Sequence, residues 1–312
     1  MTAAGESDRA VAPARRPRLA VAWSLIASTG ASAWRHRVLG LSAEAGFWQL
    51  ISLPSALLAI LGFIGYFSGA LGPDTIQSLE DAIVRAARHV IEPNSVNETI
   101  RPALHRILTG GRADVVSISF IVSLWTGSSA MATYVNTITI AYGLRSQRNA
   151  VRSRLLALVL YFGFIATSVV LLPLLVIGPS HFVQLFPDRW HDTVKTVTDI
   201  GYWPFVAVLS LLLLATLYHL AVPVRTQWRR ALPGAMLALV LWLVGSILLR
   251  AWLSWAFRST ATYGPLSAPV AVLVFLYLTA LAILIGAELN AQIDRMWPSR
   301  ETEQARDKLS ED

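Results

Sequence analysis

The chain has 312 residues, of which 54% are apolar and only 14% are charged, and its formal net charge is +7. A water-soluble domain carries about 25% charged residues, so this composition excludes a globule that covers its own core with polar surface. The absence of cysteine excludes disulfides and thiolate chemistry. A basic chain can bind nucleic acid, but here Lys and Arg form short clusters between apolar runs, which is typical of membrane proteins and predicts no nucleic-acid partner.

The first segment, residues 1–42, begins with arginines and continues into an apolar stretch, followed by Ala-Ser-Ala at 31–33. This layout is similar to a cleaved secretory signal. Cleavage would place the later basic segments outside the cell, against the positive-inside rule. We therefore predict an N-terminal interfacial helix, with Trp23 and Trp34 at the level of the lipid headgroups.

Six long intervals lack Asp, Glu, Lys and Arg, and they contain 29, 30, 33, 25, 19 and 29 residues in chain order. A helix needs about 20 apolar residues to cross the hydrocarbon core of a bilayer. Since a backbone in lipid must satisfy its own hydrogen bonds, these intervals should be helices. The sequence therefore predicts an all-α integral membrane protein with six transmembrane helices, at about 46–71, 115–141, 155–178, 201–222, 232–256 and 266–290.

The longest segment between spans contains two apolar stretches at helical spacing within residues 75–110, and we expect two amphipathic external helices there. They either lie on the bilayer or cap the outer mouth of the bundle. Gly65 and Gly69 form a small-residue face on the first span. Such a face permits close helix approach, either inside the bundle, which is the commoner outcome, or in an oligomer.

Orientation follows from the positions of Lys and Arg. If both termini are cytoplasmic, the cytoplasmic segments hold 17 of these residues and the external segments hold 8. This bias predicts a multi-pass protein of the bacterial plasma membrane with both termini inside. The segments are then an N-terminal part (1–42), a six-span membrane domain (43–297) and a tail (298–312). The tail is mixed in charge and poor in apolar residues, so we expect it to be a frayed helix end or disordered.

Motifs for catalysis are missing from the sequence: there is no Walker-type phosphate loop, no His-Glu-x-x-His and no Gly-x-Ser-x-Gly. His181, Asp188 and His191 are neighbours in one external loop, but flexible spacing favours a solvated loop over a metal site. We therefore predict no catalytic, cofactor-binding or metal-binding residue, and no enzyme activity.

Several polar residues nevertheless fall in or beside the spans. Arg250 either extends to the outer headgroups or faces a cavity and an anionic group. Glu44 and Glu288 lie where the first and last spans meet the cytoplasm, and each can bond water or pair with an Arg of the 145–154 or 225–230 loops. Asn136 favours a hydrogen bond between helices over contact with a substrate. Pro54 can kink the first span.

The last span opens with Ala-Thr-Tyr-Gly-Pro-Leu at 261–266 and closes with Leu-Ile-Gly-Ala-Glu-Leu-Asn at 284–290. With these two motifs the chain resembles the YihY/BrkB family of bacterial inner-membrane proteins, which once carried a ribonuclease label. The family usually has its span-one proline one place later, at the position of Ser55, so the kink is shifted here. The resemblance implies six spans, both ends inside and an undetermined activity, and with the polar residues above it indicates these functional positions: Glu44, Ser52, Pro54, Trp125, Asn136, Arg250, Tyr263, Gly264 and Glu288.

The leading functional hypothesis is a transporter or lipid-handling protein of the cell envelope that does not use ATP, with membrane lipids or an unknown small solute as partners. The alternative is a structural scaffold that supports the envelope through partner proteins. A polar cavity at the middle of the membrane favours transport, and a tightly packed interior favours the scaffold.

Overall fold

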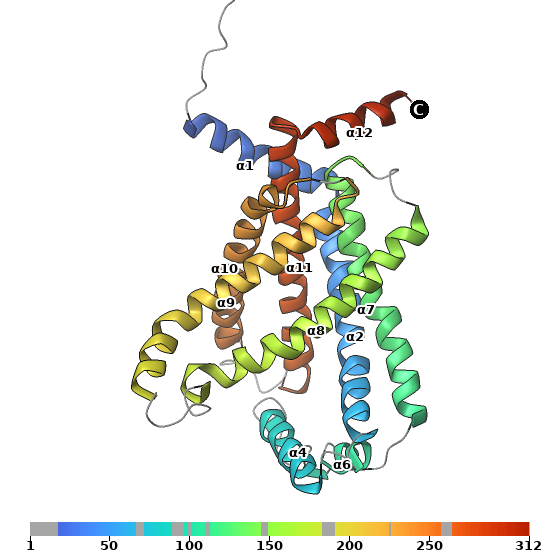
Figure 1. Cartoon of the computed structure of the whole chain (residues 1–312), viewed down its shortest axis with the longest axis vertical. Coiled ribbons are helices and arrows are strands. Elements are labelled where there is room, and N and C mark those ends of the chain that lie inside the picture. The colour runs from blue at the N-terminus through green and yellow to red at the C-terminus, as the bar shows by residue number, and fades with distance from the viewer. Residues whose placement is uncertain are drawn as a thin grey trace, which may run out of the picture.

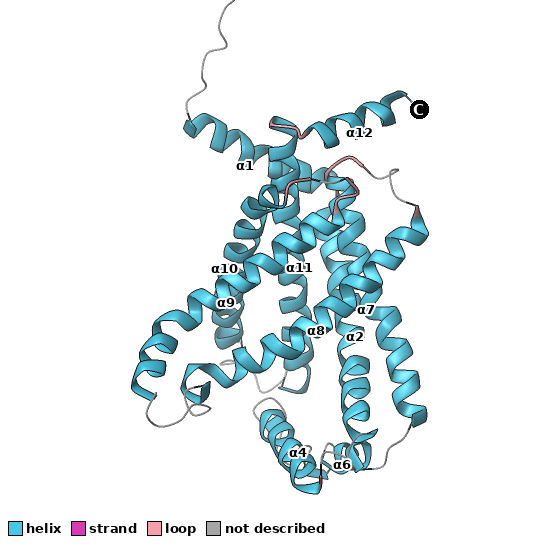
Figure 2. Cartoon of the chain, viewed as in Figure 1, coloured by secondary structure: helices cyan, strands magenta, loops and turns pink. Residues whose placement is uncertain are grey.

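The structure is a computed structural model that describes residues 18–66, 72–88, 97–98, 101–109, 113–144, 149–182, 191–224, 226–256 and 264–311. Every regular element in these residues is helical (Figure 2), which confirms the predicted all-α class. In chain order the helices are α1 (Arg18–Arg35), α2 (Val38–Tyr66), α4 (Pro73–Arg88), α6 (Arg101–Thr109), α7 (Ala113–Ala141), α8 (Ala150–Phe182), α9 (His191–Ala221), η5 (Trp228–Ala231), α10 (Leu232–Ala256), α11 (Gly264–Met296) and α12 (Arg300–Glu311).

Six helices of the described residues are long and apolar enough to cross a membrane, as predicted. Large apolar side chains such as Ile118, Val159 and Ile247 point outward from them, which suits a lipid environment. The first span, α2, starts at Val38, earlier than the predicted span, and Gly46 near its start packs against the backbone of Tyr277 in the last span. The apolar stretches are Val38–Gly62, Ser117–Ala141, Ala150–Thr167, Gly201–Ala221, Trp228–Trp255 and Pro269–Met296.

Helix α7 is the most enclosed of the six spans. It packs along α2, and α2 in turn packs along α11, which lies beside α10. Helices α8 and α9 cross this group at a slant in Figure 1, where α8 contacts α7 and α9 contacts α10. The bundle interior is therefore built around α2, α7 and α11, and the two slanted helices cover one side of it.

The two ends of the bundle carry different short helices (Figure 1). Helices α1 and α12 lie together at one end, the α1/α12 end. Helices α4 and α6 lie at the opposite end, the α4/α6 end, and this confirms the predicted amphipathic pair and N-terminal helix. The apolar faces of α4 and α6 are buried against each other and against the last turns of α2, in a cluster of Ile76, Val84, Leu104 and Leu108 with Leu61, Ile64 and Ile83.

Gly65 is part of this contact. A Cβ atom at this position would collide with the backbone carbonyl of Ile107 in α6, so the glycine permits close packing inside the chain. Gly69, the second glycine of the predicted oligomer face, lies outside the described residues.

The expectation of a frayed or disordered tail was wrong. Residues 300–311 form α12, and Thr302 and Ala305 are buried. Its first turn is closed by the Thr302 amide, which donates to Ser299 Oγ at 3.3 Å. A serine that caps the first helical turn stabilises a helix start by about 1 kcal/mol. The charge-rich sequence of the tail therefore forms a helix that lies at the end of the bundle.

Candidate functional site

Helix α11 carries a set of buried polar side chains at its C-terminal end, here called the polar stripe: Asn290 and Asp294 share one face of the helix, and Glu288 lies on another. The preceding turn brings the neighbouring helix unusually close. A Cβ atom at Gly286 would collide with the carbonyl of Gly234 in α10, and a Cβ at Gly234 would collide with the carbonyl of Gly286. Because both residues are glycine, α10 and α11 can touch backbone to backbone here, and the polar stripe is enclosed.

Glu288 is fully buried and binds His36, which follows α1 directly in the chain. The distance between Glu288 Oε1 and His36 Nδ1 is 2.7 Å, and the His36 side chain is 19% exposed. Glu288 Oε2 is buried and has no hydrogen-bond partner. The sequence left water or an arginine of the 145–154 or 225–230 loops as partners for Glu288. In the described residues the partner is instead His36, because α1 lies across α11.

Other polar atoms without partners occur in the same two helices. Thr29 Oγ1 and Ser32 Oγ on α1, and Gln292 Nε2 on α11, are buried and unbonded. Residues three or four apart in a helix share one face, so each helix has these atoms on the face that bears His36 or Glu288. A buried carboxylate with unbonded polar atoms in its two supporting helices is an unusual site, since buried polar groups normally have partners.

Asn290 fixes the start of α10. Its Oδ1 accepts from the Gly234 amide at 2.7 Å, and its Nδ2 donates to the carbonyl of Ala231 at 3.0 Å. The first of these bonds satisfies a backbone amide that a helix start leaves without an intrahelical partner. Two turns before, the Tyr218 hydroxyl on α9 donates to the carbonyl of Ile283 at 2.7 Å. Helix α11 therefore positions both α9 and α10.

Asp294 holds α12 in place. Its carboxylate binds Arg306 Nη2 at 2.8 Å and lies 3.6 Å from Arg230 Nη1. It also accepts from Thr302 Oγ1 at 3.1 Å. Arg306 Nε donates in turn to the carbonyl of Tyr142, just after α7. One buried carboxylate thus joins α7, α11, α12 and the segment before α10.

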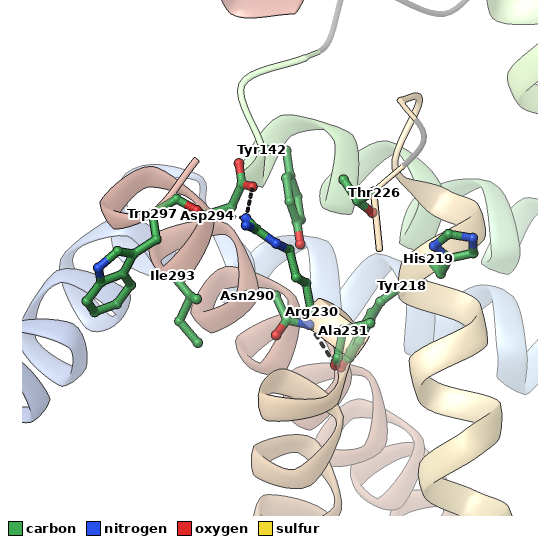
Figure 3. A pocket seen from close by; sticks show the side chains of 10 residues that line it. All are labelled: Tyr142, Tyr218, His219, Thr226, Arg230, Ala231, Asn290, Ile293, Asp294 and Trp297. Atoms are coloured by element: carbon green, nitrogen blue, oxygen red, sulfur yellow. Dashed lines mark hydrogen bonds and ion pairs between the residues drawn. The ribbon is translucent and has the colours of Figure 1, made fainter. Parts of the chain in front are cut away.

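A small cavity lies beside this cluster, with a volume of about 70 Å³ (Figure 3). A single water needs about 10–15 Å³ on this measure, so the cavity has room for a few waters but not for an organic solute. Burial, reinforced by the Asp294 carboxylate, raises the pKa of the Tyr142 hydroxyl well above its usual range, so this group stays a neutral donor. The lining consists of Tyr142, Tyr218, His219, Thr226, Arg230, Ala231, Asn290, Ile293, Asp294 and Trp297.

Three other predicted positions lie on or beside α7. Glu44 on α2 is exposed and accepts from Thr133 Oγ1 at 3.1 Å. Asn136 is exposed and accepts from Ser153 Oγ at 3.1 Å, which is the predicted hydrogen bond between helices. Trp125 is 65% exposed.

The remaining predicted positions do not gather at one site. Ser52 is buried in α2 near Pro54, which lies inside the helix and is exposed. Arg250 is exposed on α10, and Gly264 begins α11. The side chain of Tyr263 lies outside the described residues.

Sequence reasoning missed Asn290, Asp294 and His36. The i,i+4 spacing of Gly286, Asn290 and Asp294 was a usable signal for one polar helix face. His36 gave no local signal, because its partner lies 252 residues away.

Metal-ligating side chains do not cluster in the described part of the chain: no group of three or more His, Cys, Asp or Glu is close enough to hold an ion. The predicted loop with Asp188 falls outside the described residues.

Comparison with known proteins identifies the family. The sequence profile of the family described as Virulence factor BrkB matches residues 29–310. The ribonuclease-like protein YfkH of Bacillus subtilis (strain 168) is 24% identical over 266 residues, which cover 83% of this chain and 91% of that relative. No solved structure matches. The match spans nearly the whole chain, including the polar stripe of α11 and its partner His36, and the chain therefore belongs to the virulence factor BrkB family.

Proposed function

We propose that this protein is a lipid-handling protein of the bacterial plasma membrane that binds phospholipids on its lateral face and helps them to move between leaflets without ATP. The observation that carries this proposal is the position of polar groups on α7. Arg154 of α8 and the Trp125–Ser129 turn of α7 meet beside large exposed apolar side chains. Lipids reach such a place directly from the bilayer.

The bundle interior gives less support to a solute path. Several buried hydroxyls of α7 donate to their own helix, for example Thr137 Oγ1 to the Thr133 carbonyl at 2.7 Å and Thr139 Oγ1 to the Val135 carbonyl at 2.7 Å. Such groups are already satisfied and serve helix packing. The cavity at the α1/α12 end is too small for an organic solute and does not lie at the middle of the spans.

The scaffold remains the second candidate, and the α1/α12 end favours it. Asp294 and Asn290 fasten four helices into one platform on which a partner protein can bind. A scaffold needs a rigid surface and no lipid movement, so the two candidates predict different results in a protein-only vesicle.

The orientation proposed with this function places both termini in the cytoplasm. The bias of 17 to 8 in Lys and Arg supports it, and so does the common position of α1 and α12. A reporter fused after Asp312 should give a cytoplasmic signal, and an external signal would overturn the orientation.

We also propose that the protein is not a nuclease, although its relative YfkH has a ribonuclease-like name. Metal-dependent nucleases need clustered carboxylates or histidines. Purified protein should leave RNA intact with Mg²⁺, Mn²⁺ or Zn²⁺. Metal-dependent cleavage that is lost on substituting Asp188 and His191 would contradict this.

The test of the main proposal is transbilayer movement of a fluorescent phospholipid in vesicles that contain only the purified full chain. A membrane-impermeant quencher then removes the label from the outer leaflet. We expect more label to become accessible, without ATP, than in protein-free vesicles. Equal accessibility in both would overturn lipid handling and leave the scaffold.

A further inference from the structure

Arg154 is held against the lipid-facing side of α7. Its Nη2 donates to the Trp125 carbonyl at 3.3 Å and to Ser129 Oγ at 3.2 Å. Its Cζ lies 4.7 Å from the centroid of the Trp125 ring, within the range of a cation–π interaction. Trp125 and Ser129 are one turn apart on α7, so they form a single surface under the guanidinium.

The charge of Arg154 is not neutralised by these contacts. A carbonyl, a hydroxyl and a ring face are all neutral, and in the described part of the chain no carboxylate pairs with this residue. The Trp125 carbonyl is in addition shared with the hydroxyls of Ser128 and Ser129, at 3.2 and 2.6 Å. A guanidinium has five N–H donors in a planar fork, so most of its donors remain for another group.

The guanidinium of Arg154 lies within one helical turn of the headgroup region. From Glu44 to the end of α2 at Tyr66 the helix rises about 33 Å at 1.5 Å per residue, close to the roughly 30 Å of a hydrocarbon core. Glu44 therefore marks one face of the core, and it binds Thr133 of α7. Ser129 lies one turn deeper, about 6 Å, so the guanidinium lies on the acyl-chain side of the boundary, one turn below the headgroups.

The surroundings of Arg154 are those of a lipid site. On the deeper side the exposed side chains are apolar, with Ile121 65% and Leu155 62% exposed. Tryptophan favours this interfacial level, because one part of its ring is apolar and its N–H is polar. An arginine whose guanidinium is only hydrated would extend away from the helix surface, whereas the guanidinium of Arg154 lies over the Trp125 ring.

We propose that Arg154, Trp125 and Ser129 bind the phosphate group of an anionic phospholipid from the leaflet at the α1/α12 end. The guanidinium donates two hydrogen bonds to phosphate oxygens, as arginine commonly does, and Trp125 holds the start of the acyl chains. With the proposed orientation this is the cytoplasmic leaflet, whose anionic lipids attract basic groups. The inference rests on the proposed lipid handling, for which it supplies the headgroup site.

The experiment compares lipid retention by the full-length protein and its variants in native mass spectrometry. The probes are dioleoyl phosphatidylglycerol, dioleoyl phosphatidylcholine and inorganic phosphate. We expect Arg154→Ala to lower the affinity for phosphatidylglycerol about tenfold or more, the effect of losing one charge-assisted hydrogen bond. The matched control is Arg152→Ala, because Arg152 is exposed on the same turn and should bind like the wild type.

Equal loss in the Arg152 and Arg154 variants, or no loss in either, would overturn the site. Competition by millimolar inorganic phosphate would also overturn it, since the ligand would then be free phosphate. If Arg154→Ala does not fold, Arg154→Lys serves instead, because it keeps the charge and loses the planar fork, and an unchanged affinity in this variant would count against the geometry proposed.

The vesicle assay of lipid movement described above, combined with the lipid-binding measurement, separates this inference from the proposed function. Selective phosphatidylglycerol binding without accelerated lipid movement would overturn lipid handling and support the site. Accelerated movement with equal phosphatidylglycerol binding by the wild type and Arg154→Ala would overturn the site and support lipid handling.

Discussion

The two ends of the bundle each hold a buried glutamate against a histidine, and the two carboxylates are compensated in different ways. At the α4/α6 end, Glu80 binds His105 Nδ1 at 2.9 Å and Arg101 Nε at 3.2 Å, so both of its oxygens have partners. At the α1/α12 end, Glu288 binds His36 at 2.7 Å, and its second oxygen has none.

The difference reflects how each site is built. The partners of Glu80 lie 21 and 25 positions later in the chain, within the pair of short helices α4 and α6. Glu288 depends on α1 lying across α11 and on two glycines that let α10 approach. Because its partners are local, Glu80 can change its protonation without disturbing the bundle. The contacts of Glu288 should instead be lost whenever the packing of α1, α10 and α11 changes. Four predictions test this contrast.

The largest effect is expected from Gly286→Ala. The new Cβ would collide with the Gly234 carbonyl, which is backbone and cannot rotate away. Overpacking of this kind destabilises by about 3 kcal/mol, the upper part of its usual range. Thermal melting in one detergent measures it. Gly245→Ala is the control, because its nearest neighbour atoms are 3.9 Å away and alanine favours the helix. Equal melting temperatures for the two variants would show that the close approach of α10 is not required.

Glu288→Gln should have the next largest effect, about 2 kcal/mol, because it removes the charge that faces His36 and changes an enclosed acceptor into a donor. We expect lower folded yield and a lower melting temperature than for Glu301→Gln, whose carboxylate is exposed on α12. If both variants melt together and both complement a deletion phenotype, the Glu288 carboxylate contributes neither to stability nor to function.

Asp294→Asn should release α12 while leaving the spans intact, since Arg306 and Arg230 are partly exposed and can be hydrated. The expected loss is about 1 kcal/mol, with faster proteolysis between residues 297 and 311. Glu303→Gln, an exposed change on the same helix, is the comparison. Unchanged cleavage of α12 would mean that its apolar contacts alone hold it.

The smallest effect concerns pH at the α4/α6 end. The hydrogen bond from His105, with help from Arg101 and against the opposing effect of burial, lowers the pKa of the Glu80 carboxyl below its ordinary value. A lowered carboxyl pKa stabilises the fold above the unfolded value, and that contribution is lost as pH falls through the folded pKa. The protection of α4 and α6 against hydrogen exchange, taken relative to the intrinsic rate at each pH, should therefore fall below about pH 4.5. In Glu80→Gln this fall should vanish, and its persistence would assign the effect to another group.

Much of the topology could be predicted because membrane length and charge placement act locally. The six spans, the amphipathic pair α4 and α6 and the N-terminal helix all follow from runs of apolar residues and from amphipathic spacing. The α12 helix was mispredicted because its apolar contacts are few and its start depends on Ser299 and Thr302 meeting Asp294.

By itself the sequence determined which segments cross the membrane, because each must fill a hydrocarbon layer of known thickness with its own satisfied backbone. Which polar side chains meet was decided only by the tertiary structure. His36 and Glu288 are 252 residues apart, and Arg154 reaches back 29 residues to Trp125. No local pattern encodes such pairs, because they depend on the crossing of α1 over α11 and on the slant of α8 against α7.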